Sequence, residues 1–451
     1  MEADKLKKDS LNLLETIALS VAIMGPSASI AITVGMMGNF VNYSEPLVFF
    51  ISMIIIGFVA VSIVKLNQYF PSSGSVYFFA QKTLGKRAGF VTGWLIILAY
   101  LMLGASCSAV ATSYYQNLLS IFDVHIHWKI ISIILMLVIG YLAHKDAKTS
   151  SGVMLIIEII SMGLILVLAF IIVIGASKTT GLSIEPFKLG ENSFSSIGYA
   201  AVFGFLAFSG FEGASVLGEE SKNPKKTIPI AIFCSVLITG FLYIFVSYAQ
   251  VLGFGISPEG IKAFTSSETP LGELISKYLS SKFSILIMLC VGISFFSTTL
   301  GCVNAGARVL FTMSRDCMLS QALSKTHKKY NTPYIGLNIF ISIITIVLMA
   351  NVGLEAIHLG GYVAMTGTLA LLLSYIITTA GAIAFFHKNK LWRNFQLIIP
   401  ILSIIALAFI FFANIYPVRA FPMNMFSYIV LVWLIIGVLI SKRKTAFSGL
   451  Q

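Results

Sequence analysis

The chain has 451 residues, of which 57% are hydrophobic and 11% are charged. Soluble domains carry about 25% charged residues, so this composition excludes a soluble globular protein and predicts an integral membrane protein with many spans. The net charge of +12 would suit a nucleic-acid partner, but the basic residues lie between apolar segments, which argues against that class.

Twelve apolar segments follow one another, each close to the about 17–25 residues that a helix needs to cross a bilayer. The first begins directly after the polar stretch MEADKLKKDS, so we expect it to be retained as a span and not cleaved as a signal peptide. The predicted segments are 12–40, 44–66, 88–118, 129–144, 151–176, 195–220, 228–253, 283–312, 334–351, 359–386, 395–415 and 424–441.

Lysine and arginine are unevenly distributed between the two sets of connecting segments. The chain contains 30 of these residues, and 23 of them fall on the side that includes the N-terminus. The other seven are Lys129, Lys178, Lys188, Lys262, Lys277, Lys282 and Arg419. Because cytoplasmic loops are enriched in Lys and Arg, both termini are predicted to be cytoplasmic. We expect a multi-pass protein of a bacterial cell membrane.

Two of the segments are interrupted by residues that disfavour a continuous helix. The first contains residues 25–29 (GPSAS), and the sixth contains residues 209–212 (SGFE). They lie five segments apart, so one begins inside and the other outside. Gly/Pro-interrupted segments at matching positions of two halves indicate a transporter's binding site near the membrane midplane. We therefore predict an all-α fold with an inverted repeat of five helices.

Paired breaks also predict a type of ligand. A broken helix leaves N–H groups unpaired on one half and C=O groups unpaired on the other. Half-helix N-termini attract a carboxylate, while C-terminal carbonyls attract an ammonium group. Two breaks side by side therefore suit a zwitterion, such as the head group of an α-amino acid.

Four stretches of the chain carry short motifs in a consistent order. They are 204–229 (GFLAFSGFEGASVLGEESKNPKKTIP), 70–77 (FPSSGSVY), 304–316 (NAGAR followed by SRD) and Thr332-Pro333. These motifs resemble the amino acid–polyamine–organocation superfamily of permeases, from about residue 10 to 440. The resemblance implies one transporter domain over residues 1–451. Its expected parts are a first repeat at 12–176, a second at 195–386 and two additional helices at 395–441.

The breaks and the resemblance together select the candidate substrate-binding residues. Because Pro26 has no N–H group, the donors of the first break must come from residues 27–29. Phe208 or Phe211 is a candidate hydrophobic lid. The alternatives are a proline kink packed against a neighbour and ordinary core packing of the aromatic rings. The candidate set is Met24, Gly25, Ser27, Ala28, Ser29, Phe208, Ser209, Gly210 and Phe211.

Glu212 and Glu158 lie inside apolar segments and are candidates for ion coupling or pH sensing. Burial favours the neutral form of a carboxyl group, so Glu212 is suited to carry a coupling proton. The alternative is that Glu212 caps the second half-helix. Proton-driven relatives can carry a lysine in the fifth helix. Here no Lys or Arg lies between Lys148 and Lys178, which argues against lysine-based coupling.

The eighth segment contains hydroxyl groups at residues 297–299 (STT), which suit a sodium ion or a substrate, or bond back to their own helix. Leu206 and Cys302 stand where some relatives place stacking tryptophans, which favours a neutral amino acid over a guanidinium or diamine. The charged residues near the predicted cytoplasmic ends are expected to form structural or gating ion pairs. They are Glu219, Glu220, Arg308, Arg315 and Asp316.

The function predicted from the sequence is secondary active transport of neutral amino acids, coupled to protons, by alternating access. The alternatives are an exchanger, a polyamine or cationic amino acid permease, a channel, and a non-transporting sensor. No phosphate-binding loop and no nucleophile–base or metal-ligand constellation is visible, so we predict no enzyme, no metal and no cofactor. The expected partners are the small-molecule substrate, a coupling proton and membrane lipid.

Overall fold

The computed structural model of the chain is built from helices. It describes residues 11–71, 74–145, 147–179, 181–217, 221–267, 270–279, 281–351, 353–418 and 421–447. The helices are α1 (Leu13–Met24), α2 (Pro26–Val41), α3 (Glu45–Tyr69), α4 (Ser75–Leu84), α5 (Lys86–Ser120), α6 (Trp128–Ala143), α7 (Ala147–Thr179), η1 (Glu185–Phe187), α8 (Phe194–Phe208), η2 (Phe211–Leu217), α9 (Pro224–Phe254), α10 (Pro258–Ser266), α11 (Pro270–Tyr278), α12 (Ser281–Arg315), η3 (Gln321–Ser324), α13 (Tyr334–Ala350), α14 (Ala356–Lys388), η4 (Asn394–Leu397), α15 (Ile398–Ala413) and α16 (Met425–Phe447).

Each predicted apolar segment is mainly helical over the residues that the structure describes. Within the described residues, ten helical stretches are long and apolar enough to cross a membrane. Two shorter apolar helices, α6 and α13, coincide with the predicted segments 129–144 and 334–351. The prediction of an all-α polytopic membrane protein is therefore confirmed.

The connection between α9 and α12 contains two short helices, α10 and α11. Pro258 begins α10 and Pro270 begins α11. Proline is favoured at the first position of a helix, where its missing N–H would have had no partner. Both prolines therefore start helices in this connection.

The first break is narrower than the predicted interruption over residues 25–29. Gly25 alone separates α1 from α2, with φ +53° and ψ 60°. Its N–H donates to the carbonyl of Val21 at 3.1 Å, which closes α1. This left-handed conformation is accessible to glycine at low cost. Pro26 is the first residue of α2, so it starts the second half-helix and does not extend the break.

The second break packs directly against the first. Ser209 and Gly210 connect α8 to the 3₁₀ helix η2, and Gly210 has φ +94°. A Cβ atom on Gly210 would lie 2.4 Å from Cγ2 of Ile23 in α1, so only glycine fits this contact. The predicted sixth segment ran to residue 220. The described helical part ends at Leu217, and residues 218–220 lie outside the described ranges.

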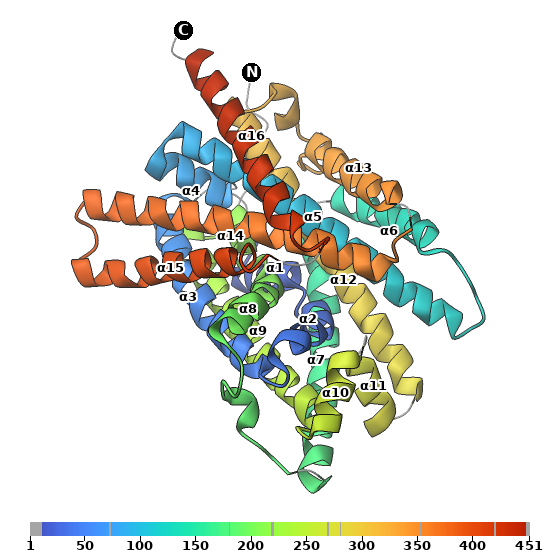
Figure 1. Cartoon of the computed structure of the whole chain (residues 1–451). Coiled ribbons are helices and arrows are strands. Elements are labelled where there is room, and N and C mark those ends of the chain that lie inside the picture. The colour runs from blue at the N-terminus through green and yellow to red at the C-terminus, as the bar shows by residue number, and fades with distance from the viewer. Residues whose placement is uncertain are drawn as a thin grey trace.

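The broken helices lie in the middle of the bundle, where α1, α2 and α8 are surrounded by other helices (Figure 1). In the hydrophobic window of Phe194–Leu217, 94% of residues are buried, compared with 28% in those of α15 and α16. Non-helical backbone is tolerated at membrane depth only where protein or a cavity surrounds it. Enclosure by the neighbouring helices meets this condition for both breaks.

Candidate functional site

A cavity lies where the two breaks meet. Its lining includes residues from α1, α2, α5, α12 and α14 as well as the α8–η2 break. The lining contains no Asp, Glu, Lys, Arg or His side chain among the described residues. Its apolar and sulphur-bearing side chains include Ile23, Met24, Met36, Cys107, Leu206 and Cys302. The cavity volume is about 50 Å³, so side chains must move before a ligand larger than a few waters fits.

Only part of the predicted substrate-binding set lines this cavity. Met24, Ser29, Ser209 and Gly210 do so. Gly25 lies behind them, where a Cβ atom would approach Oγ1 of Thr298 to 1.8 Å. The N–H of Ala28 donates to Oγ of Ser294 at 3.2 Å, and that of Ser29 donates to the carbonyl of Gly25 at 2.8 Å. These two donors at the start of α2 therefore already have partners within the protein.

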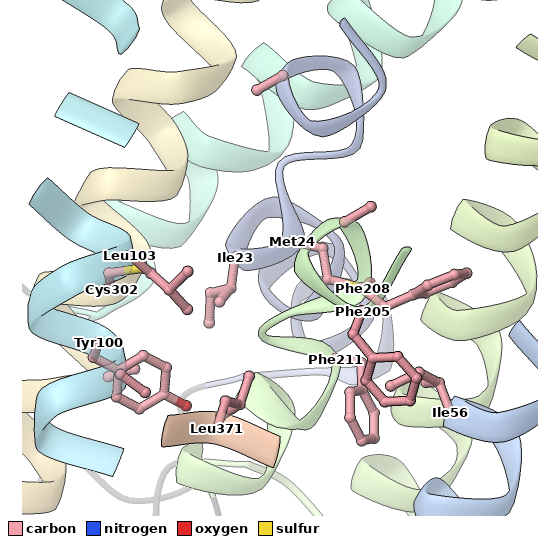
Figure 2. Packing of buried hydrophobic residues seen from close by; sticks show 14 of the residues in the cluster. Ile23, Met24, Ile56, Tyr100, Leu103, Phe205, Phe208, Phe211, Cys302 and Leu371 are labelled. Atoms are coloured by element: carbon pink, nitrogen blue, oxygen red, sulfur yellow. The ribbon is translucent and has the colours of Figure 1, made fainter. Parts of the chain in front are cut away.

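The aromatic candidates Phe208 and Phe211 lie in the core and not in the cavity lining. The ring of Phe208 packs edge-on against Tyr243, with centroids 5.1 Å apart, and that of Phe211 packs against Tyr375 at 5.3 Å. Figure 2 shows both side chains away from Tyr100, with Ile23 between them and Tyr100 in this view. Their position favours the core-packing alternative over a hydrophobic lid. The side chain of α8 that reaches the cavity is Leu206.

Two tyrosines hold the fully buried carboxylate of Glu212. The hydroxyl of Tyr100 in α5 donates to Oε1 at 2.8 Å, and that of Tyr375 in α14 donates to Oε2 at 2.5 Å. Tyr100 also lines the cavity. Because both oxygens of Glu212 are hydrogen-bonded, this group joins three helices at the base of the cavity. This geometry favours a structural role for Glu212.

Replacing Tyr375 with Phe should weaken this junction. The substitution leaves Oε2 of Glu212 buried without its donor, which costs about 1–3 kcal/mol. We expect a lower melting temperature for Tyr375→Phe in detergent. Adding Glu212→Gln should change stability by less than the sum of the two single changes, because the groups share one network. If the stability changes of the two substitutions simply add, the three side chains do not form one coupled network.

Glu158 lies in α7, behind the first break, and it is also buried. Oγ of Ser294 in α12 donates a short hydrogen bond to its Oε1, and the same Oγ accepts from the N–H of Ala28. Oε2 of Glu158 and Oγ of Ser27 are both buried without a hydrogen-bond partner. The hydroxyl of Ser27 lies near the Glu158 carboxyl group without meeting hydrogen-bond geometry. The carboxyl group of Glu158, with one oxygen that accepts no hydrogen bond, therefore lies at the N-terminus of α2.

The hydroxyl groups predicted in the eighth segment mostly bond back to their own helix. Oγ1 of Thr298 donates to the carbonyl of Ser294 at 3.0 Å, and that of Thr299 donates to the carbonyl of Phe295 at 2.9 Å. Oγ of Ser297 is buried without a partner. The back-bonding alternative fits Thr298 and Thr299.

The end of the bundle that is predicted to be cytoplasmic is closed by contacts between the broken helices. The N–H of Lys222 donates to the carbonyl of Leu11 at 2.9 Å, and the hydroxyls of Thr16 and Ser221 lie 3.0 Å apart. Oγ of Ser20 in α1 donates to the carbonyl of Phe211 in η2 at 2.8 Å. These bonds fasten α1 to η2 and to the segment that follows it.

Some of the charged residues predicted at this end also have partners. Asp316 accepts a hydrogen bond from the hydroxyl of Tyr77 at 3.0 Å. Arg308 is buried and donates to the carbonyl of Asn304 at 3.2 Å. Glu219 and Glu220 lie outside the described residues.

The opposite end is more open. A second cavity of about 400 Å³ lies between α2, α8, α14 and the C-terminal end of α10. It shares Ile32, Met36 and Gly361 with the central cavity. The central cavity is therefore adjacent to a wider space on the side of α10, which the charge distribution predicts to be external.

Sequence reasoning missed several residues of this site. Tyr375 lies in an apolar stretch (LLLSYIITT) without any distinguishing motif. Met36 and Cys107 resemble ordinary core residues in the sequence. Nothing in a single sequence separates side chains that line a cavity from those that fill the core, because both are apolar.

A polytopic bundle whose two broken helices meet at a cavity is the architecture of a secondary transporter. The family model "Amino acid permease" matches residues 11–440. The chain therefore belongs to the amino acid permease family. This agrees with the resemblance found in the sequence and with the prediction that the protein is a permease and not an enzyme.

Three similar proteins have been assigned different substrates. The branched-chain amino acid permease BcaP of Bacillus subtilis is 28% identical over 298 residues, which cover 62% of this chain and 61% of that protein. The low-affinity putrescine importer PlaP of Escherichia coli is 25% identical over 331 residues, covering 72% and 71%. The methylthioribose transporter of Bacillus subtilis is 29% identical over 293 residues, covering 60% and 59%. The chain thus matches less than two thirds of the length of BcaP.

Proposed function

We propose that this protein is a secondary active transporter that takes up neutral amino acids with protons, by alternating access. The observation that carries the proposal is the cavity between the two helix breaks, which has no charged side chain among its described lining residues. Met24, Ser29, Ser209 and Gly210 reach the cavity from the breaks, so we assign the zwitterionic head group to them.

The lining supports a neutral and apolar substrate side chain. A diamine or a cationic amino acid would bring a second ammonium group into the cavity, where burial of an unpaired charge is costly. Glu212 accepts a hydrogen bond from Tyr100, which lines the cavity, but both oxygens of Glu212 already accept hydrogen bonds. Leu206, Met36 and Cys302 offer apolar surface to an aliphatic or thioether side chain instead.

We assign proton coupling to Glu158 and not to Glu212. Glu158 has an oxygen without a partner and lies at the N-terminus of α2, beside the break. Its bond to Ser294 also reaches Ala28. A change in its protonation would therefore alter contacts among α2, α7 and α12. Glu212 is held on both oxygens, which supports a structural role.

The closed contacts near Leu11 and Phe211 and the wider cavity beside α10 support a conformation that faces the external side. Inward opening would then require the bonds between α1 and η2 to break. The cytoplasmic orientation of both termini, the cell-membrane location and a bacterial origin belong to the same proposal.

Uptake into proteoliposomes with a competition screen tests this function. The screen should include the twenty amino acids, putrescine and methylthioribose, because the names of the similar proteins give different substrates. We expect aliphatic neutral amino acids to compete best. Competition by putrescine alone would support the polyamine alternative. Binding in a thermal-shift assay without uptake would support a sensor, and non-saturating current would support a channel.

The driving force for uptake distinguishes a proton symporter from an exchanger. A proton symporter accumulates substrate in liposomes loaded with buffer alone when the outside is acidic. An exchanger needs amino acid inside the liposomes and gains nothing from a pH difference. Uptake that depends only on internal amino acid would therefore contradict proton coupling.

A further inference from the structure

A cluster of lysines lies away from the central cavity, at the end of α6 and in the connection between α12 and α13. Lys145 follows α6, and exposed Lys328 and Lys329 belong to the connection. Oγ1 of Thr332 donates to the carbonyl of His144 at 3.3 Å, which joins the two segments. Lysines from both segments are thereby brought together at the end of the bundle that is predicted to be cytoplasmic.

Two of these lysines share one aromatic ring. Nζ of Lys145 lies 5.3 Å from the ring centroid of Tyr330, and Nζ of Lys329 lies 5.4 Å from the same centroid. Nζ of Lys145 also lies 4.7 Å from the centroid of Tyr141. Hydrogen bonds to Tyr141 and Tyr330 raise the pKa of Lys145, so this ammonium group stays charged at neutral pH.

Within the residues that the structure describes, no ion pair neutralises this cluster. Between α12 and α13 the acidic residue is Asp316, which accepts a hydrogen bond from Tyr77. Helix α6 contains no acidic residue, and Asp146 lies outside the described residues. Two ammonium groups close to one ring repel each other, so an anion bound between them would be stabilised.

An exposed apolar face of α6 leads to the same cluster. Spacings of three and four residues place its side chains on one side of the helix. Because α6 is an apolar helix of a membrane protein, this face contacts lipid acyl chains. The side chains are Ile130, Ile133, Ile134, Leu137, Val138 and Tyr141, exposed by 44 to 69%. The face ends at Tyr141, over which Lys145 lies.

We propose that Lys145, Lys329 and Tyr330 bind the phosphate of an anionic phospholipid whose acyl chains lie along this face of α6. The lysines complement the charge of the phosphate, and the apolar face accounts for the chains. A free anion would interact with the lysines but not with the apolar face of α6. The cytoplasmic leaflet of membranes carries anionic lipid, which matches the side on which the cluster is predicted to lie.

Native mass spectrometry of the full chain in detergent, titrated with phosphatidylglycerol, tests the proposal, with phosphatidylcholine as the zwitterionic comparison. A lysine close to anionic lipid strengthens binding about fivefold. The double variant Lys145→Ala/Lys329→Ala should therefore bind phosphatidylglycerol about 25-fold more weakly. Lys225→Ala/Lys226→Ala removes the same charge from exposed lysines of α9 and should bind like the unaltered protein.

Equal binding by the two double variants would overturn the proposal, whether both retain the lipid or both lose it. Displacement of phosphatidylglycerol by the same concentration of inorganic phosphate would overturn the assignment to a lipid. Because Lys329 is exposed, Lys329→Ala alone provides a variant that should fold. We expect it to bind about fivefold more weakly, and unchanged binding would again contradict the proposal.

Discussion

Replacing Glu158 with Gln should abolish accumulation driven by a pH gradient. An inward gradient of one pH unit supplies about 1.4 kcal/mol per proton, which supports about tenfold accumulation of substrate. Gln keeps the size of the side chain and can still accept the hydrogen bond from Ser294, but it cannot bind a proton near neutral pH. In proteoliposomes the accumulation ratio of Glu158→Gln should therefore fall to about one.

Exchange provides the internal control for this variant. Counterflow of labelled substrate against internal substrate needs no proton, so Glu158→Gln should retain it if the protein is folded. Glu259→Gln, which changes an exposed acidic residue of α10, should behave like the unaltered protein in both assays. Persistent pH-driven accumulation by Glu158→Gln would contradict the assignment and would move coupling to Glu212.

Replacing Gly25 with Ala should cause the second large effect, a loss of transport. The left-handed conformation at this residue costs about 1–2 kcal/mol for a residue with a Cβ atom. The added atom would also lie 1.8 Å from Oγ1 of Thr298, and overpacking of this kind costs about 1–3 kcal/mol. Together these costs predict a fall in the initial uptake rate of more than about tenfold.

Gly57→Ala is the matched control, because a Cβ atom on Gly57 in α3 meets nothing within 4 Å. It should leave uptake unchanged at equal expression. Gly25→Ala combined with Thr298→Ala removes the 1.8 Å contact with Oγ1 but leaves the Cβ atom of residue 298 at 3.1 Å and keeps the backbone strain, so we expect partial recovery. Normal uptake by Gly25→Ala would show that the geometry of the first break does not matter for transport.

The sequence was sufficient to predict most of the helices, because the length of an apolar segment determines whether it can form a membrane span. It also located both breaks, since glycine and proline have strong backbone effects. It predicted their extent less well. Pro26 suggests an interruption in a sequence, but at the first position of α2 its missing N–H removes no helical bond.

The site was predicted only in part, because helix rotation decides which neighbouring residues face a cavity. Phe208 and Leu206 are two residues apart in α8, yet Phe208 packs against Tyr243 while Leu206 lines the cavity. The role of Glu212 depends on Tyr100 and Tyr375, which lie far from it in the chain. Contacts of this kind follow from tertiary packing and leave no local pattern.

Protection of Cys107 from a membrane-permeant maleimide tests the central claim most directly. Cys107 lines the proposed substrate cavity, whereas Cys317 is exposed outside it and serves as a control in the same molecule. Labelling of both is measured by peptide mass spectrometry. We predict that saturating leucine slows labelling of Cys107 and leaves Cys317 unchanged. Equal labelling of Cys107 with and without a substrate that is transported would contradict a site between the broken helices.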